Sequence, residues 1–229
     1  LYLPLASSYR GLVRELALAG RFEAAVERFA ELMDLPRTVH EEEVSELRIS
    51  AAHWLCLCKS DLEPDADGLR CLMDIKLQLQ ELGCELDAPG EFAELLEELA
   101  DYACSAGEPE AAAELYEEML QLEGSPQVRA HQLRVAARIC ACHAERGELE
   151  RAGDYFEKLP PLEDGRPCAA YHDAAAAVVQ AMVEKGNYQE ALAFHKQALM
   201  SQMLPGADIW SSVDFNRALL PALARASLK

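Results

Sequence analysis

Gly186 separates two segments in which apolar residues recur every three or four positions, the spacing of one face of an α-helix. A glycine accepts the left-handed backbone conformation that ends a helix, and the following Asn187 can cap the next one. Ala191, five residues after the glycine, is small enough to let the second helix lie close against the first. The stretch 184–199 therefore predicts two antiparallel helices joined by a tight turn.

The same pattern occurs three more times along the chain, at 20–32, 107–120 and 147–159. Each of these copies has a glycine, an alanine five residues later and an aromatic residue nine residues later, where the copy at Gly186 has His195. The last three glycines are 40 and 39 residues apart, and the first interval of 87 residues leaves room for one degenerate copy. A recurring unit of this length is typical of stacked helical hairpins.

Proline and glycine breaks divide the chain into about eleven predicted helices. The degenerate copy is expected as two helices that end near Lys59 and at Gly83, followed by a break at 87–90. The longest polar break is expected at 160–167, and a last helix at about 209–220. Because no break is long enough for an interdomain linker, residues 1–229 are expected to form a single all-α domain, an α-solenoid of about five hairpins plus a C-terminal helix.

The hairpins resemble the tetratricopeptide (TPR) repeat family, best at Gly186, Tyr188, Ala191 and Ala198. The unit here is longer than the family's repeat of about 34 residues, and its first helices lack the usual tryptophan and Leu-Gly pair. The resemblance implies TPR-like helical hairpins. A weaker resemblance to pentatricopeptide repeats covers 213–220 (VDFNRALL), and it implies binding of single-stranded RNA at one base per repeat.

Composition agrees with a helical chain, because Ala, Leu and Glu dominate and aromatic residues make up only 7%. No apolar stretch approaches the roughly 20 residues needed to span a bilayer, and the chain does not begin with a signal peptide. It also lacks an initiator Met, so we expect a piece of a larger protein. Most of the eight cysteines lie in apolar helical runs, which predicts reduced, buried thiols in an intracellular protein, cytoplasmic or nuclear.

The formal net charge of −19 is unevenly distributed. Between Lys76 and Arg129 there is no Lys or Arg, whereas the same interval holds 14 acidic residues, including Glu94. One interpretation is a solvated face that keeps the protein in solution, and the other is a docking surface for a basic partner. In either case this segment should repel a phosphate backbone, which argues against direct nucleic-acid binding.

The TPR resemblance also indicates which residues face the inner surface, namely those ten and six positions before each repeat glycine. The basic-plus-Asn set with which some TPR proteins grip the acidic tails of chaperones is missing there. Together with Glu94, the polar members of this set are the candidate partner-binding residues Arg10, Arg14, Glu94, Glu97, Asp101 and Gln180. The last predicted helix carries an apolar surface that predicts self-association through Trp210, Val213 and Phe215, unless it packs back on the preceding helix.

Motifs for chemistry are weak. Residues 63–74 (EPDADGLRCLMD) imitate a calcium loop, but Pro64, Arg70 and the short Asp74 fit poorly, so a capped turn between helices is preferred. His53 with Cys56 and Cys140 with His143 provide two ligands each, too few for zinc. We therefore expect no metal, no cofactor and no enzymatic activity. The predicted function is a non-catalytic interaction or assembly scaffold, and the alternative is a pentatricopeptide-like RNA-binding or ribonucleoprotein-assembly module.

Overall fold

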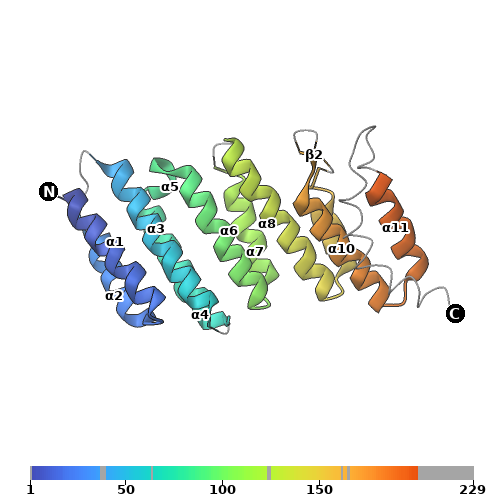
Figure 1. Cartoon of the computed structure of the whole chain (residues 1–229), viewed down its shortest axis with the longest axis horizontal. Coiled ribbons are helices and arrows are strands. Elements are labelled where there is room, and N and C mark those ends of the chain that lie inside the picture. Colours follow the sequence, from blue (N-terminus) through green and yellow to red (C-terminus); the bar gives the residue numbers. More distant parts are fainter. Residues whose placement is uncertain are drawn as a thin grey trace. The chain divides into compact units, whose positions relative to one another are not determined.

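The computed structural model is almost entirely α-helical, and helices adjacent in the chain pack against each other (Figure 1). It describes residues 2–36, 40–62, 64–122, 125–160, 162–163 and 166–200. The helices in these residues are α1 (Tyr2–Leu18), α2 (Phe22–Met33), α3 (Glu41–Ser60), α4 (Ala66–Glu81), α5 (Cys84–Asp87), α6 (Pro89–Ser105), α7 (Pro109–Met119), α8 (Pro126–Glu145), α9 (Leu149–Phe156), α10 (Ala169–Glu184) and α11 (Tyr188–Met200). The predicted last helix and its self-association residues Trp210, Val213 and Phe215 lie outside the described residues. No helix in the described ranges is both long and apolar enough to cross a membrane.

Two predicted boundaries are wrong in detail, and one predicted break contains two short strands. The break expected at 87–90 is shorter, because the single-turn helix α5 reaches Asp87 and α6 already begins at Pro89, which suits the first turn of a helix. The helix expected to reach 159 ends at Phe156. The break expected at 160–167 contains the two-residue strands β1 (Leu162–Glu163) and β2 (Arg166–Pro167), which pair antiparallel.

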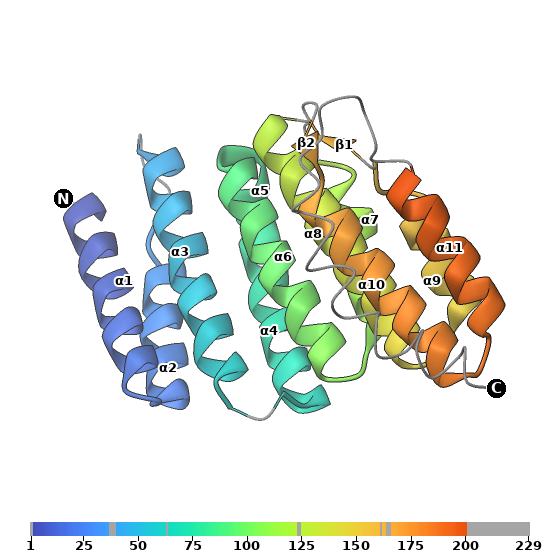
Figure 2. The same cartoon turned by 45° about the vertical axis from the view of Figure 1, so that its right-hand side comes forward.

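The chain divides into two compact units, 1–132 and 133–229, with the boundary inside α8. In the first unit α1 packs against α2 and α3, α3 packs against α4, α5 and α6, and α6 packs against α7. Figure 2 shows α1, α3 and α6 as successive neighbours in one row, with α2, α4 and α7 behind them. In the second unit α10 packs against both α9 and α11, and the Phe156 ring lies between Tyr171 and Phe194 at centroid distances of 4.6 and 5.0 Å.

The predicted glycine turns are confirmed at all four positions. Gly20, Gly107, Gly147 and Gly186 have φ angles of 67°, 81°, 74° and 80°, in the left-handed region that side chains other than glycine rarely adopt. After each glycine, the next backbone N–H donates to the carbonyl five residues earlier at 2.8–2.9 Å. This bond, together with that from the glycine N–H, ends the helix in a Schellman motif. One local geometry is therefore repeated four times.

The small residue after each turn also lies where the sequence predicts. Ala25, Ala112, Ala152 and Ala191 have no exposed surface, as expected for the closest approach of two helices. The position nine residues after the glycine is buried in three copies, including His195, and half-buried at Phe156. The repeat pattern therefore marks the contact face of each second helix.

The degenerate hairpin α3–α4 turns without a repeat glycine. The Asp65 carboxylate caps α4 by accepting a hydrogen bond of 2.5 Å from the Gly68 N–H. A Cβ at Gly68 would lie 2.1 Å from the Tyr102 hydroxyl, which itself accepts a hydrogen bond from the Asp65 N–H at 3.2 Å. The predicted capped turn is thus confirmed. Gly68, the glycine of the segment that imitates a calcium loop, leaves room for Tyr102 of α6.

Candidate functional site

The predicted partner-binding residues lie in two places. Five of them belong to the first unit, on α1 (Arg10 and Arg14) and on α6 (Glu94, Glu97 and Asp101). The sixth, Gln180, lies on α10 in the second unit, where its exposed amide donates to the Glu184 carboxylate at 2.7 Å. The geometry of the first unit therefore decides which of these residues act together.

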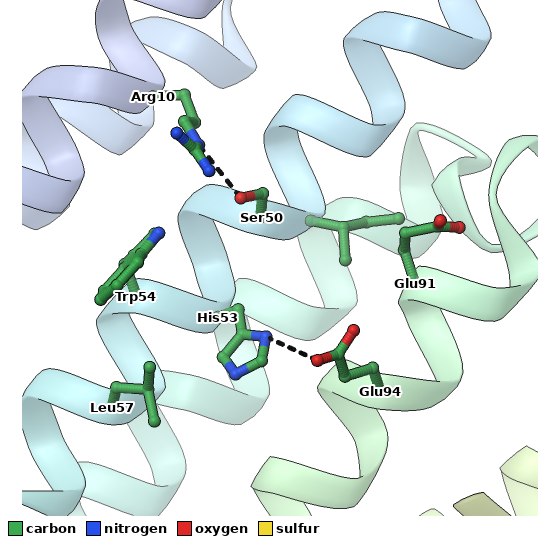
Figure 3. A pocket seen from close by; sticks show the side chains of 8 residues that line it. Arg10, Ser50, His53, Trp54, Leu57, Glu91 and Glu94 are labelled. Atoms are coloured by element: carbon green, nitrogen blue, oxygen red, sulfur yellow. Dashed lines mark hydrogen bonds and ion pairs between the residues drawn. The ribbon is translucent and has the colours of Figure 1, made fainter. Parts of the chain in front are cut away.

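An open pocket lies on the α1–α3–α6 row, and we call it the α3 groove (Figure 3). Its volume is about 300 Å³. One wall comes from α1, the floor from α3 and the other wall from α6. The lining residues are Arg10, Ile49, Ser50, His53, Trp54, Leu57, Glu91 and Glu94. Two of the predicted partner-binding residues, Arg10 and Glu94, thus lie on opposite walls of one pocket.

The wall from α1 is basic and rests on the floor through side-chain contacts. The Arg10 Nε donates a hydrogen bond of 3.1 Å to the Ser50 hydroxyl. The Arg14 guanidinium lies over the Trp54 indole, 5.3 Å from the ring centroid, which is cation–π geometry. These contacts hold both cations at the edge of the groove and keep the half-buried indole in place.

The wall from α6 is acidic. Glu91 is exposed, and the Glu94 side chain keeps 49% of its surface exposed. His53 rises from the floor between two carboxylates, 3.9 Å from Glu94 through Nδ1 and 3.7 Å from Glu98 through Nε2 (Figure 3 draws the contact with Glu94). An imidazole carries a full charge only when protonated, so this wall has carboxylates opposed by a single titratable base.

Glu98 lies on the same helix, and its pKa is affected by burial and by the charged side chains around it. Burial raises the pKa of the Glu98 carboxyl above its usual value, and the nearby His53 partly opposes the rise. The carboxylates of Asp101, Glu97 and Glu94 add to it. Burial is the largest cause of the rise, and the neighbouring carboxylates on α6 add a repulsion that a cation from outside would reduce.

Two acids of the long acidic interval are held by contacts between helices. Glu118 accepts from the buried Lys76 ammonium at 2.6 and 2.7 Å, which links α7 to α4. Glu97 lies 2.5 Å from Nδ1 of the buried His131, so this predicted partner-binding residue joins α6 to the start of α8. The outward acidic surface is therefore smaller than the sequence indicates, and Glu91 and Glu94 are its exposed members at the α3 groove.

Sequence reasoning missed His53, Trp54 and Ser50 as groove residues, because the α3 hairpin has no repeat glycine from which to count. A signal was present, since the repeat length of about 40 residues leads from Arg10 to Ser50 and from Arg14 to Trp54.

The described residues contain no group of three or more side chains that could hold a metal ion. No protein-family model matches the chain, and no curated protein is significantly similar to it.

Proposed function

We propose that this chain is a non-catalytic protein-interaction module that docks a basic partner on the α1–α3–α6 row of its first unit. The observation that carries the proposal is the α3 groove, where exposed carboxylates face solvent beside an apolar floor. A charged wall next to an aromatic anchor is a combination found at recognition surfaces, since the charges steer the partner and the indole supplies contact area.

We further infer that the hairpins form an α-solenoid of TPR-like repeats. The four identical glycine turns and their buried alanines support this architecture. In the second unit the Lys185 ammonium donates to the Gly147 carbonyl, so two successive turns lie next to each other there. Arrays of stacked hairpins present extended surfaces to partners, in agreement with a role in assembly.

The proposal is tested by partner capture from cell extract with matched charge variants. The groove variant carries Glu91→Lys and Glu94→Lys together with Asp101→Lys, an exposed acid further along α6. The control carries Glu81→Lys, Glu108→Lys and Glu114→Lys, which change the net charge equally. We expect the wild type and the control to retain the same proteins at about 150 mM salt, and the groove variant to lose them. Equal loss from both variants would show that bulk charge, rather than this surface, binds the partners.

The alternative, an RNA-binding or ribonucleoprotein-assembly module, makes the opposite prediction. A chain with a net charge of −19 should bind mixed single-stranded RNA poorly at about 150 mM salt, because both molecules are negative. Sub-micromolar binding in a titration would contradict the protein-only proposal. A scaffolding role inside a ribonucleoprotein, without direct RNA contact, would instead appear as ribonucleoprotein subunits among the captured partners.

A further inference from the structure

We propose that the α3 groove captures one arginine side chain of the partner, with its guanidinium on Glu91 and Glu94 and its aliphatic stem along the floor. This inference rests on the proposed function and names the chemistry that the same site recognises. It is carried by a pocket of about 300 Å³ whose two walls have opposite charge.

The position of the cation follows from the acidic wall. Glu91 and Glu94 are exposed and line the pocket, and the one base among the lining residues near them is His53, at 3.9 Å from Glu94. That distance is longer than a charge-assisted hydrogen bond of about 2.8 Å, so Glu94 keeps acceptor capacity for a stronger donor. A cation placed there would also reduce the repulsion that Glu94 adds to the effect of burial on the pKa of Glu98.

Arginine suits this groove better than lysine. The guanidinium is planar, donates two parallel hydrogen bonds to carboxylates and is more weakly hydrated than an ammonium, so it loses less on leaving water. Its stem can cover the apolar part of the lining, which comes from Ile49, Trp54 and Leu57. A lysine would supply the charge, but its ammonium cannot donate two parallel hydrogen bonds to the carboxylates and loses more hydration on leaving water.

The basic wall sets the surroundings of that arginine. Arg10 lines the pocket and Arg14 lies on the edge of the floor over Trp54, so a second cation on this side would be repelled. A carboxylate next to the captured arginine would be favoured there. The expected occupant is therefore an arginine flanked by an acidic residue, rather than a run of basic residues.

The experiment uses Trp54 fluorescence in the full chain. The chain has two tryptophans, so Trp210→Phe leaves Trp54 as the single reporter, inside the groove. Seven-residue peptide libraries are compared with arginine, lysine, glutamate or citrulline fixed at the centre and the other positions randomised. Citrulline is the matched control, because it keeps the shape of arginine and removes its charge. The strongest arginine peptide is then titrated against the variants.

We expect the arginine library to bind best, with an acidic residue enriched beside the arginine. Citrulline should weaken the strongest peptide about 10-fold or more, the amount that a loss of about 1.4 kcal/mol produces. Glu91→Gln with Glu94→Gln should weaken it by a similar factor, whereas the control pair Glu81→Gln and Glu114→Gln should stay within about 2-fold. The substituted residues are exposed, so all variants should melt like the parent.

Three results would overturn the inference: citrulline or lysine peptides that bind as tightly as arginine, groove variants that bind unchanged, and the absence of binding by any library. None of these results contradicts the proposed function, which is tested separately by partner capture with the variants that replace acidic residues of the chain by lysine. If capture depends on Glu91, Glu94 and Asp101 while the peptides show no preference for arginine, the partner docks on the acidic wall by another chemistry.

Discussion

Arg48 is a charged side chain with no exposed surface, and its contacts show how the core tolerates it. One terminal nitrogen lies 2.7 Å from the Glu41 carboxylate, and the other donates to the Leu35 carbonyl at 2.8 Å. The guanidinium thus connects the backbone just after α2, at Leu35, to Glu41 in the first turn of α3. A buried charge is acceptable only with such partners, because an unpaired one costs several kcal/mol.

Arg48→Met should lower the free energy of unfolding by about 3 kcal/mol, since it removes the cation and leaves the Glu41 carboxylate, only 16% exposed, without it. Adding Glu41→Gln should recover part of this loss, because the side chain then no longer carries the charge that Arg48 neutralised. Urea denaturation of the single and double variants measures both effects. A loss below about 1 kcal/mol would mean that water reaches the carboxylate.

The cysteines should differ in reactivity according to burial. Seven of the eight are buried and Cys71 is half-buried, so the predicted burial of most thiols is confirmed. Burial raises the pKa of Cys140 to about 12 and raises that of Cys56 still more strongly, with a further contribution from Glu98. Because the thiolate is the reactive form, both thiols should stay unreactive at neutral pH.

We expect a maleimide at pH 7.5 to modify Cys71 first in the native protein, and Cys56 and Cys140 only after denaturation. Burial also raises the pKa of Cys71, but Lys59 opposes the rise and the side chain is accessible. Mass spectrometry of digests taken over time identifies the modified residue. Cys71→Ser is the control and should abolish the early product, and early labelling of Cys56 would show that α3 opens readily.

At the scale of the element, the repeated unit is a helix end followed by a tight helix contact. The glycine provides a backbone conformation, and the alanine five residues later provides the absence of a side chain. Both requirements are local, and both recur in α1–α2, α6–α7, α8–α9 and α10–α11. The α3–α4 hairpin differs, because the Asp65 carboxylate caps the start of α4 and Gly68 leaves room for Tyr102 of α6.

Gly20→Ala should destabilise the protein by about 1 kcal/mol, because an added Cβ disfavours the positive φ although the space around it is open. Gly11→Ala is the matched control. It lies inside α1 with equally open space and an ordinary helical conformation, so it should stabilise by about 0.5–1 kcal/mol. Thermal denaturation compares the two, and effects of equal sign would refute the role assigned to the turn.

Ala191→Leu should lower stability by about 1–3 kcal/mol, because the residue has no exposed surface in α11, which packs against α10. The neighbouring Gln189→Leu, on an exposed position of the same helix, should change stability by less than about 0.5 kcal/mol. Melting curves followed by circular dichroism measure both. An unchanged melting temperature for Ala191→Leu would mean that the repeat register is wrong.

At the scale of the whole molecule, the net charge of −19 is partly used inside the fold. Lys76 and His131 each hold a carboxylate of the interval that has no base of its own, so these acids support packing between helices. In the described part of this interval, the exposed acids lie on α6, on α7, at the end of α4 and in the turn before α7, namely Glu91, Glu94, Asp101, Glu110, Glu114, Glu117, Glu81 and Glu108. A charge count along the chain therefore overstates the surface that a basic partner meets.

Self-association through the C-terminal residues stays a prediction, because Trp210, Val213 and Phe215 lie outside the described residues. We expect light scattering to show a concentration-dependent dimer, and Trp210→Glu with Phe215→Glu to give a folded monomer, since a two-fold interface places the same apolar patch on both chains. Leu192→Glu, an exposed apolar position on α11, is the control and should leave the dimer intact. A wild type that is monomeric at every concentration would refute the prediction.

The sequence by itself determined the helices, the four glycine turns and the buried alanines. Each of these depends on backbone conformation or side-chain size within a few residues, so spacing along the chain is enough to locate them. The single-turn helix α5 and the early start of α6 escaped, because an Ala-Pro-Gly stretch can break a helix or begin one and only the packing of α5 between α3 and α6 chooses.

The tertiary structure decided which polar residues meet. Lys76 and Glu118 are 42 residues apart along the chain, and His131 and Glu97 are 34 residues apart. Nothing in the local sequence around these residues indicates which of them form a pair. The α3 groove likewise combines three helices, and it converts two predicted residues, Arg10 and Glu94, into opposite walls of one pocket. Contacts of this kind depend on the register of packed helices, which local patterns do not encode. The sequence therefore gives the charge of a residue, but only the fold decides which side chain it meets.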